Sequence, residues 1–128
     1  MIHDRKLARI KRKRSFKIRS DSKLFFNDYS EEMFERIELV KNTFNDGLAL
    51  GFRNIKFTKA KNIITLRNAE LSASENTDLI CDEEYLPIKK SSLDLIISFF
   101  NLHASNDIPG ILFQINQSLK PNGLFMGC

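Results

Sequence analysis

The 128-residue chain has little of what several specialised classes of protein require. Its two cysteines, Cys81 and Cys128, are too few for a disulfide framework, and no Cys/His pair has the spacing of zinc ligands. Five glycines and three prolines exclude collagen-like and Gly/Pro-rich low-complexity sequence. No apolar run approaches the roughly 20 residues of a membrane span, and no apolar signal-peptide stretch follows the N-terminus. We therefore expect a cytoplasmic protein without a structural metal site.

Apolar residues are abundant enough for a folded core. Hydrophobic residues make up 42% of the chain and include eleven Phe, although Trp is absent. This share excludes a wholly disordered chain. A length of 128 residues favours one domain with a sizeable core.

Positive charge is concentrated at the N-terminus. Residues 1–20 carry nine basic groups and one acid, whereas the other 108 residues carry 11 basic and 15 acidic groups. A segment of this charge attracts the phosphates of nucleic acid or of an anionic membrane surface. The alternative is a solvated helix or frayed arm with no dedicated partner, because few apolar residues lie between the charges. The basic residues are Arg5, Lys6, Arg9, Lys11, Arg12, Lys13, Arg14, Lys17 and Arg19.

Helical spacing of apolar residues predicts a helix over 30–42. We interpret 20–30 as a polar connector with an aromatic patch, and Asp28 as the cap of the helix, with Glu31 completing a capping box. The Asn-Asp-Gly triplet at 45–47 is expected to break the helix. The apolar positions are Met33, Ile37 and Val40.

Five short apolar runs predict β-strands. Continuous apolar runs suit strands that are covered on both faces, which is typical of a parallel sheet. Between the last two runs we expect a helix that is capped by Asn106 or Asp107 and closed by Lys120 in its last turn. A turn at 121–123 follows, so that this part of the chain forms a βαβ unit. The runs are 48–50, 62–66, 79–81, 93–100 and 124–126.

Polar side chains at the carboxyl ends of these strands are the candidate ligand-binding residues, because ligands of open α/β sheets bind there. Three acids, Asp82, Glu83 and Glu84, lie just past the third run, where an acid can accept hydrogen bonds from a ribose or an adenine amino group; a solvated acidic turn is the alternative for all three. His103 follows the fourth run, with a polar loop or an interior histidine as its alternative. Cys81 is expected to be a buried small hydrophobe, not a nucleophile. The pattern assigns no catalytic residue.

The segment 81–127 resembles the central half of class I S-adenosylmethionine-dependent methyltransferases. The likeness is carried by DEEYLP, LDLIIS, NLHASNDIPG and LKPNGLF, in this order and spacing. More narrowly, the segment resembles the methyltransferase-like assembly factors of respiratory complex I and, more distantly, the malonyl-acyl carrier protein methyltransferases of biotin synthesis. HDRKLARIKRKRS and FFNDYSEEMFERI extend the likeness toward the N-terminus.

The resemblance implies an α/β fold with an incomplete Rossmann-like parallel sheet, flanking helices and a basic N-terminal helix or arm. It divides the chain into residues 1–27, the arm and connector, and 28–128, a partial methyltransferase-like domain. It also implies S-adenosylmethionine as the cofactor, with Asp82 at the adenine and the loop after the fourth strand facing the methyl donor or substrate. The implied cofactor-binding residues are Gly51, Asp82, Glu83, Asn101, Leu102 and His103.

Several positions depart from the family pattern. The first strand of the family ends in D-L-G-x-G-x-G, but here Ala49 stands at the acid, and Arg53 and Ile55 stand at two glycines. Side chains there would occupy the volume of the methionine moiety. After the second strand, Glu70 is the one acid among the candidates for the ribose. The interval from Gly51 to 82 is shorter than in the family by about one helical element, and the family's last strands do not follow 124–126.

These departures favour a methyltransferase-like protein that is a truncated or degenerate copy with weak or no activity alone. The alternatives are a non-catalytic assembly or interaction module of the same fold and a phosphate- or nucleic-acid-binding protein that acts through the basic arm. The expected partners are a second chain that completes the sheet, a respiratory complex subunit, nucleic acid or an anionic membrane at residues 5–19, or a second copy of the chain.

Overall fold

The computed structural model of the chain describes residues 4–15, 20–52, 60–73 and 75–128. Predictions for Lys17, Arg19, Arg53 and Ile55 therefore fall outside the described residues. The elements, in chain order, are α1 (Arg5–Ser15), α2 (Ser20–Glu38), β1 (Phe44–Leu50), β2 (Ile63–Glu70), β3 (Leu79–Ile80), β4 (Leu93–Ser98), a short 3₁₀ helix (Leu102–Ala104), α3 (Ile108–Ser118) and β5 (Leu119–Gly127).

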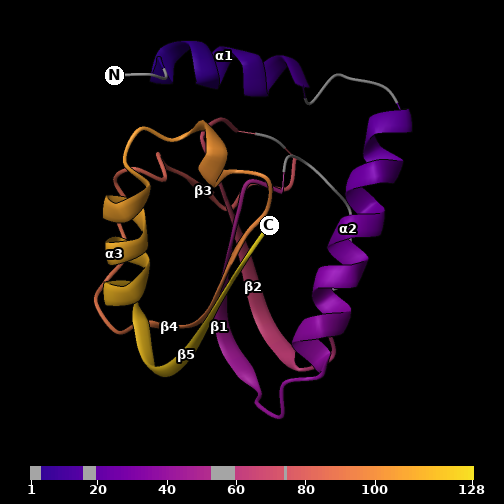
Figure 1. Ribbon diagram of the computed structural model, residues 1–128, viewed down its shortest axis with the longest axis vertical. Helices are drawn as coiled ribbons and strands as arrows, with labels where there is room; N and C mark the ends of the chain where they lie inside the picture. Colours follow the sequence, from indigo (N-terminus) through magenta and orange to yellow (C-terminus); the bar gives the residue numbers. More distant parts are fainter. Residues whose placement is uncertain (1–3, 16–19, 53–59, 74) are drawn as a thin grey trace.

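The five strands form one parallel sheet in the order β3-β2-β1-β4-β5. β1 lies in the middle, where Leu48 pairs with Arg67 of β2 on one side and with Ile96 of β4 on the other. The prediction of an α/β fold with a parallel sheet is confirmed. Because all strands run the same way, their carboxyl ends meet at one edge, below α1 (Figure 1).

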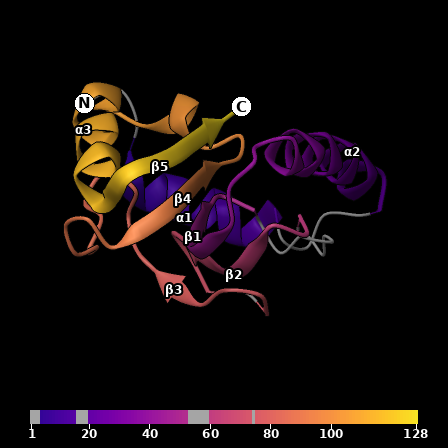
Figure 2. The same cartoon turned by 90° about the horizontal axis from the view of Figure 1, so that it is seen from below.

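Each face of the sheet packs against a helix, and the two views show α2 and α3 on opposite sides (Figures 1 and 2). Consecutive residues of the central strands alternate between the two core clusters: Leu95 and Ile97 belong to the α2 side, and Ile96 to the α3 side. This alternation explains the continuous apolar run of β4, since both of its faces are covered. Helix α2 contributes Met33, Phe34 and Ile37, and α3 contributes Ile111 and Ile115.

The predicted connector at 20–30 is wrong, because α2 covers that segment and ends at Glu38. Asp28, predicted as the helix cap, lies inside the helix. The apolar face of the helix extends further toward the N-terminus than predicted: Phe26 precedes Met33 by two turns and packs edge-on against two Phe rings after β4, at centroid distances of 5.9 and 5.5 Å. The aromatic patch is thus part of the helix–sheet contact.

The triplet at 45–47 was expected to break a helix but lies within β1. A Cβ atom on Gly47 would stand 2.9 Å from Leu66 Cδ1 and 3.1 Å from the carbonyl oxygen of Thr65, both in β2. This glycine therefore permits close packing beside β2, and the chain needs no turn there.

Helix α3 is capped by Asp107, which accepts a hydrogen bond from the Gly110 N–H at 2.9 Å. The expectation that Lys120 closes this helix is wrong, because β5 begins at Leu119. The Lys120 ammonium lies 3.2 Å from Asp94 and so joins β5 to β4. The predicted turn at 121–123 is an irregularity inside β5, with Asn122 at a φ of 66°. None of the described helices is long and apolar enough to cross a membrane.

We expect Gly47→Val to lower the free energy of unfolding by about 1–3 kcal/mol, because the added side chain overpacks the β1–β2 contact. Asn45→Val is the matched control, since the side chain at 45 is exposed on the same strand and should change stability by no more than about 0.5 kcal/mol. Urea unfolding measures both. Equal stability of the two variants would contradict the packing role of Gly47.

Candidate active site

The ends of β1 and β4 are in close contact at the carboxyl edge of the sheet. Gly51 follows β1 with a φ of +84°, in the left-handed region that favours glycine. A Cβ atom there would stand 2.9 Å from Asn101 Cβ and 2.8 Å from the carbonyl oxygen of Phe99. The Gly51 N–H also donates to the carbonyl of Ala69 at the end of β2, at 3.4 Å. Gly51 thus sits where three strand ends meet.

Carboxylates gather at the same edge. Glu70 ends β2 and is buried, and Asp82, Glu83 and Glu84, here called the acid cluster, follow β3. Glu83 is only 2% exposed, so the alternative of a solvated acidic turn is wrong for this residue. Such a carboxylate needs hydrogen-bond donors or a counter-charge, because its desolvation costs several kcal/mol.

Helix α1 supplies the counter-charge by lying across the strand ends (Figure 1). Arg5 binds Asp82 through two nitrogens: Nε donates to Oδ2 at 3.1 Å and Nη2 to Oδ1 at 2.6 Å. Its Nη2 also lies 2.7 Å from Glu83 Oε1, and its Nη1 donates to the carbonyl of Ala104 at 3.0 Å. One guanidinium therefore joins the ends of β3 and β4.

Arg12 lies two helical turns further along α1 and is 6% exposed. Its Nη2 donates to Glu83 Oε1 at 3.0 Å and to Asn101 Oδ1, and its Nη1 donates to Glu83 Oε2 at 3.4 Å. A backbone contact adds to this, since the Ser72 hydroxyl donates to the carbonyl of Arg9 at 3.3 Å. The alternative of a frayed arm is therefore wrong for residues 5–15, which form a helix attached through Arg5 and Arg12, whereas most of its other basic side chains are solvated.

The surroundings of two side chains at this edge, Asp82 and Cys81, shift their pKa values. Burial raises the pKa of Asp82, but hydrogen bonds from Arg5 and from the Glu84 N–H, with the charges of Arg5 and Arg12, hold the pKa below its usual value. Burial and the neighbouring charges of Glu83, Asp82 and Glu70 raise the pKa of Cys81 to about 11. At neutral pH the Cys81 thiol is protonated, which fits the expectation that it is no nucleophile.

The structure brings Gly51, Asp82, Glu83 and Asn101 together, directly or through the two arginines. It does not bring the other two predicted residues to them: Leu102 packs against the α3-side core, and His103 is exposed. Among the described residues, no group of three His, Cys, Asp or Glu is arranged to hold a metal ion.

Sequence reasoning counted Arg5 and Arg12 only as members of a basic run. Their spacing of seven places both on one face of a helix, with Ala8 between them, and this spacing was the available signal. The run of surrounding charges hid it, because Lys6, Lys11 and Lys13 occupy the exposed positions.

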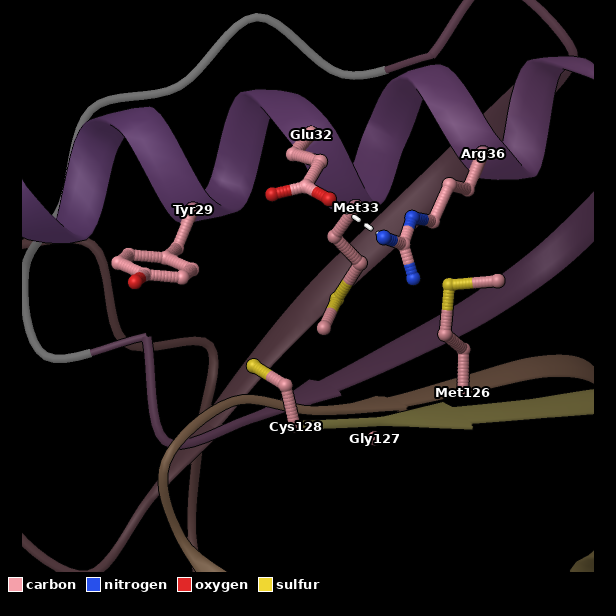
Figure 3. A pocket seen from close by; sticks show the side chains of 7 residues that line it. All are labelled: Tyr29, Glu32, Met33, Arg36, Met126, Gly127 and Cys128. Carbon is pink, nitrogen blue, oxygen red and sulfur yellow. Dashed lines mark hydrogen bonds and ion pairs between the residues drawn. The ribbon is translucent and has the colours of Figure 1, made fainter.

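A hollow lies away from the acid cluster, between α2 and the end of β5 (Figure 3). Its volume is about 190 Å³. In Figure 3, Met33 of α2 points toward the sheet, and the Glu32–Arg36 ion pair, at 2.5 Å, lies along the helix. The lining residues are Tyr29, Glu32, Met33, Arg36, Met126, Gly127 and Cys128.

Comparison with known proteins links these features to one family. The family model described as "Methyltransferase domain" matches residues 20–127. The arginine-hydroxylase NDUFAF5, mitochondrial, of Danio rerio is 44% identical over 63 residues, which cover 49% of this chain and 20% of that protein. The putative methyltransferase RP459 of Rickettsia prowazekii (strain Madrid E) is 41% identical over 56 residues, 44% of this chain and 25% of that protein.

The matched segment thus spans a quarter or less of the length of these curated relatives. Among solved structures, a chain in the complex between the Haloferax volcanii Trm112 methyltransferase activator and the putative methyltransferase has a TM-score of 0.51 and 19% identity. The likeness covers 72% of this chain and 49% of that chain. It confirms the Rossmann-like parallel sheet expected from the sequence.

Acid is expected to weaken the α1 contact. Because the pKa of Asp82 is lowered by folding, its ion pair stabilises the fold fully above about pH 4, and this stabilisation is lost as the pH falls through the lowered pKa. Urea unfolding of the wild type and of Asp82→Asn between about pH 2 and about pH 6 should give a stability difference that shrinks toward acid. Glu35→Gln, which changes an exposed side chain on α2, is the control. If the stability difference between the wild type and Asp82→Asn does not depend on pH, the pairing is contradicted.

The Cys81 thiol is expected to react slowly with iodoacetamide at neutral pH. In a Cys128→Ser background, the rate should rise about tenfold per pH unit from about pH 7 to about pH 10, because the thiolate is the reactive form. A short unstructured peptide with one internal cysteine, whose thiol titrates at about pH 8.5, is the reference. If the reaction rate of Cys81 levels off at the same pH as the rate of the reference thiol, the acids at the strand ends do not act on Cys81.

Proposed function

The chain belongs to the methyltransferase domain family, and from this premise we propose that the carboxyl edge of its sheet binds the adenosyl group of S-adenosylmethionine. The observation that carries the proposal is the presence of buried carboxylates at the ends of β2 and β3, beside a glycine of positive φ at the end of β1. The ribose hydroxyls and the adenine amino group are hydrogen-bond donors, so carboxylates suit them.

Each strand end has a part in this proposal. Asp82 would accept from the adenine, as the family resemblance implies, with Glu83 beside it, and Glu70 at the end of β2 would accept from a ribose hydroxyl. Gly51 would keep the ends of β1 and β4 in close contact beside the ligand, because any larger residue there meets Asn101. Asn101 would face the ligand from the end of β4.

The residues fit the adenosyl half of the cofactor better than its methionine half. Ala49, at the position of the family acid, is buried in the α2-side core together with Phe52, which stacks on Phe99 at 4.9 Å. No carboxylate of β1 therefore reaches the edge. When bound, S-adenosylmethionine would supply an electrophilic methyl group, and the residues named here would bind and orient its adenosyl half. We propose no catalytic residue, since His103 is exposed and the Cys81 thiol is protonated.

A non-catalytic assembly or interaction module is the second candidate function. The observation that favours it is that β5 is an outermost strand of the sheet, beside the hollow of Figure 3. Among the described strands, β5 pairs with β4 alone. A strand at an open edge can accept another strand through its backbone. A further polypeptide segment, in a second chain or a second copy, would complete the sheet there, and the family resemblance suggests a respiratory complex subunit as partner.

Phosphate binding by the basic arm would involve fewer charges than the sequence suggested. Arg5 and Arg12 face the acid cluster, so nucleic acid or an anionic membrane would meet only the outer side of α1. The exposed basic residues there are Lys6, Arg9, Lys11, Lys13 and Arg14.

Isothermal titration with S-adenosylmethionine tests the proposed function. The wild-type chain is expected to bind at micromolar concentration, and Asp82→Asn should weaken binding about 10-fold or more, because a charged acceptor is lost. Glu35→Gln has the same loss of charge at an exposed site on α2 and should bind as the wild type does. Unchanged affinity of Asp82→Asn would reject the site, and a null titration with a cooperatively melting wild type would favour the interaction module.

A further inference from the structure

Helix α1 is attached to the domain by charge more than by apolar burial. Its inward side chains are Arg5 and Arg12, whereas its two large aliphatic side chains, Leu7 and Ile10, are 46% and 48% exposed. A surface helix that is held by apolar packing has the reverse arrangement, as α3 does with Ile111. The position of α1 therefore depends on its ion pairs.

The two arginines occupy the oxygens that the proposed function assigns to a ligand. Glu83 Oε1 lies 2.7 Å from Arg5 Nη2 and 3.0 Å from Arg12 Nη2, and its other oxygen accepts from Arg12 Nη1. Both oxygens of Asp82 accept from Arg5. A carboxylate offers about four lone-pair positions, so few remain for ribose or adenine donors.

The same contacts also close the approach to the site. Under Arg12, Glu83 is 2% and Asn101 is 1% exposed. A ligand that binds these groups must therefore displace Arg12, and since Arg12 is part of a helix, it must displace that turn of α1.

We propose that α1 is a lid held by charge: Arg5 and Arg12 close the acid cluster in the ligand-free chain, and α1 leaves it when S-adenosylmethionine binds. This proposal rests on the proposed function and adds its regulation. The helix carries seven basic residues and no acidic one, so its attraction to the acid cluster is electrostatic; salt weakens it by screening the exposed basic residues and the separated charges of the open state, and screens the buried Arg12–Glu83 pair less. Once detached, a helix of 11 residues is marginal in water and is expected to unfold.

Amide hydrogen exchange tests the attachment. In the double variant Arg5→Gln/Arg12→Gln, the amides of α1 should exchange at least about tenfold faster than in the wild type, because the helix detaches and unfolds. Lys6→Gln/Lys13→Gln is the matched control: it removes the same charge from the outer side of the same helix and should leave α1 protected. Retained protection in the double variant would overturn the proposal.

The wild-type chain gives a second test that needs no substitution. Raising the salt concentration from about 0.05 M to about 1 M shortens the screening length several-fold and should speed exchange in α1. Exchange in α3, which is held by buried Ile111 and Ile115, should not change. Equal salt effects on the two helices would show that α1 is not held by charge.

Titration with S-adenosylmethionine tests the competition. The double variant should bind about 10-fold or more tightly than the wild type, whereas Asp82→Asn, which removes an acceptor as well as a lid contact, should bind more weakly. Adding the cofactor to the wild type should speed exchange in α1. Weaker binding by the double variant would overturn the lid and make the arginines part of the binding site.

Failure of the proposed function gives a different result. If α1 is released in the double variant and neither protein binds S-adenosylmethionine, the charge-held attachment is supported and the cofactor assignment fails. A thermal melt of each variant shows that the sheet is intact in every comparison.

Discussion

The arrangement of the strand-end edge depends on the carboxylate of Glu83. This side chain is almost fully buried at the end of β3, where an ionised carboxylate is stable only with donors or a counter-charge. Arg12 provides both and is itself buried in doing so. The position of α1 follows, because a guanidinium fixed at Glu83 fixes the helix that carries it. If either residue of this pair is removed, the other is left as a buried charge without compensation. The helix and the acid therefore stabilise each other's burial.

The parallel sheet is what makes this edge acidic. β1, β2 and β3 lie side by side in the same direction, so Glu70 at the end of one strand lies near Asp82 and Glu83 at the end of the next. Negative charge accumulates on the β2–β3 side, where it adds to the effect of burial in raising the pKa of Cys81. On the β1–β4 side the contacts are tight and largely apolar, with Gly51 against Asn101 and the stacked rings of Phe52 and Phe99.

The strands and α3 were predictable from the sequence because their signals are local. An apolar run at 93–100 is enough to predict β4 (Leu93–Ser98), and Asp107 was one of two predicted caps of α3. Other features depend on partners distant in the chain. Gly47 has the local pattern of a turn, and only Leu66 across the sheet shows why it lies in a strand.

For the candidate site, sequence reasoning named four residues that meet at the strand ends but not the arginines that join them. Gly51, Asp82, Glu83 and Asn101 were predicted from their places after the strands and from the family resemblance, and they do meet. The spacing of Arg5 and Arg12 placed both on one helical face, but it could not show that Arg12 pairs with Glu83, which lies 71 positions away, or single it out among six other basic residues of α1. Its burial is decided by the desolvation of a distant acid, which no local pattern records.

The sign of the charge at this edge also restricts the ligands that suit it. Glu70, Asp82, Glu83 and Glu84 place negative charge at this edge, which repels phosphate and attracts hydrogen-bond donors and cations. A phosphate-bearing nucleotide is therefore a poor ligand here, even though the helix above is rich in basic residues, because its two inward arginines are already neutralised by the acids. S-adenosylmethionine carries no phosphate; besides its α-carboxylate it has a positive sulfonium, an ammonium group and the donors of its ribose and adenine. Under the proposed function, a guanidinium and the adenosyl half of this cofactor would satisfy the same carboxylates by the same chemistry, so that the chain's own helix would take the place of a ligand.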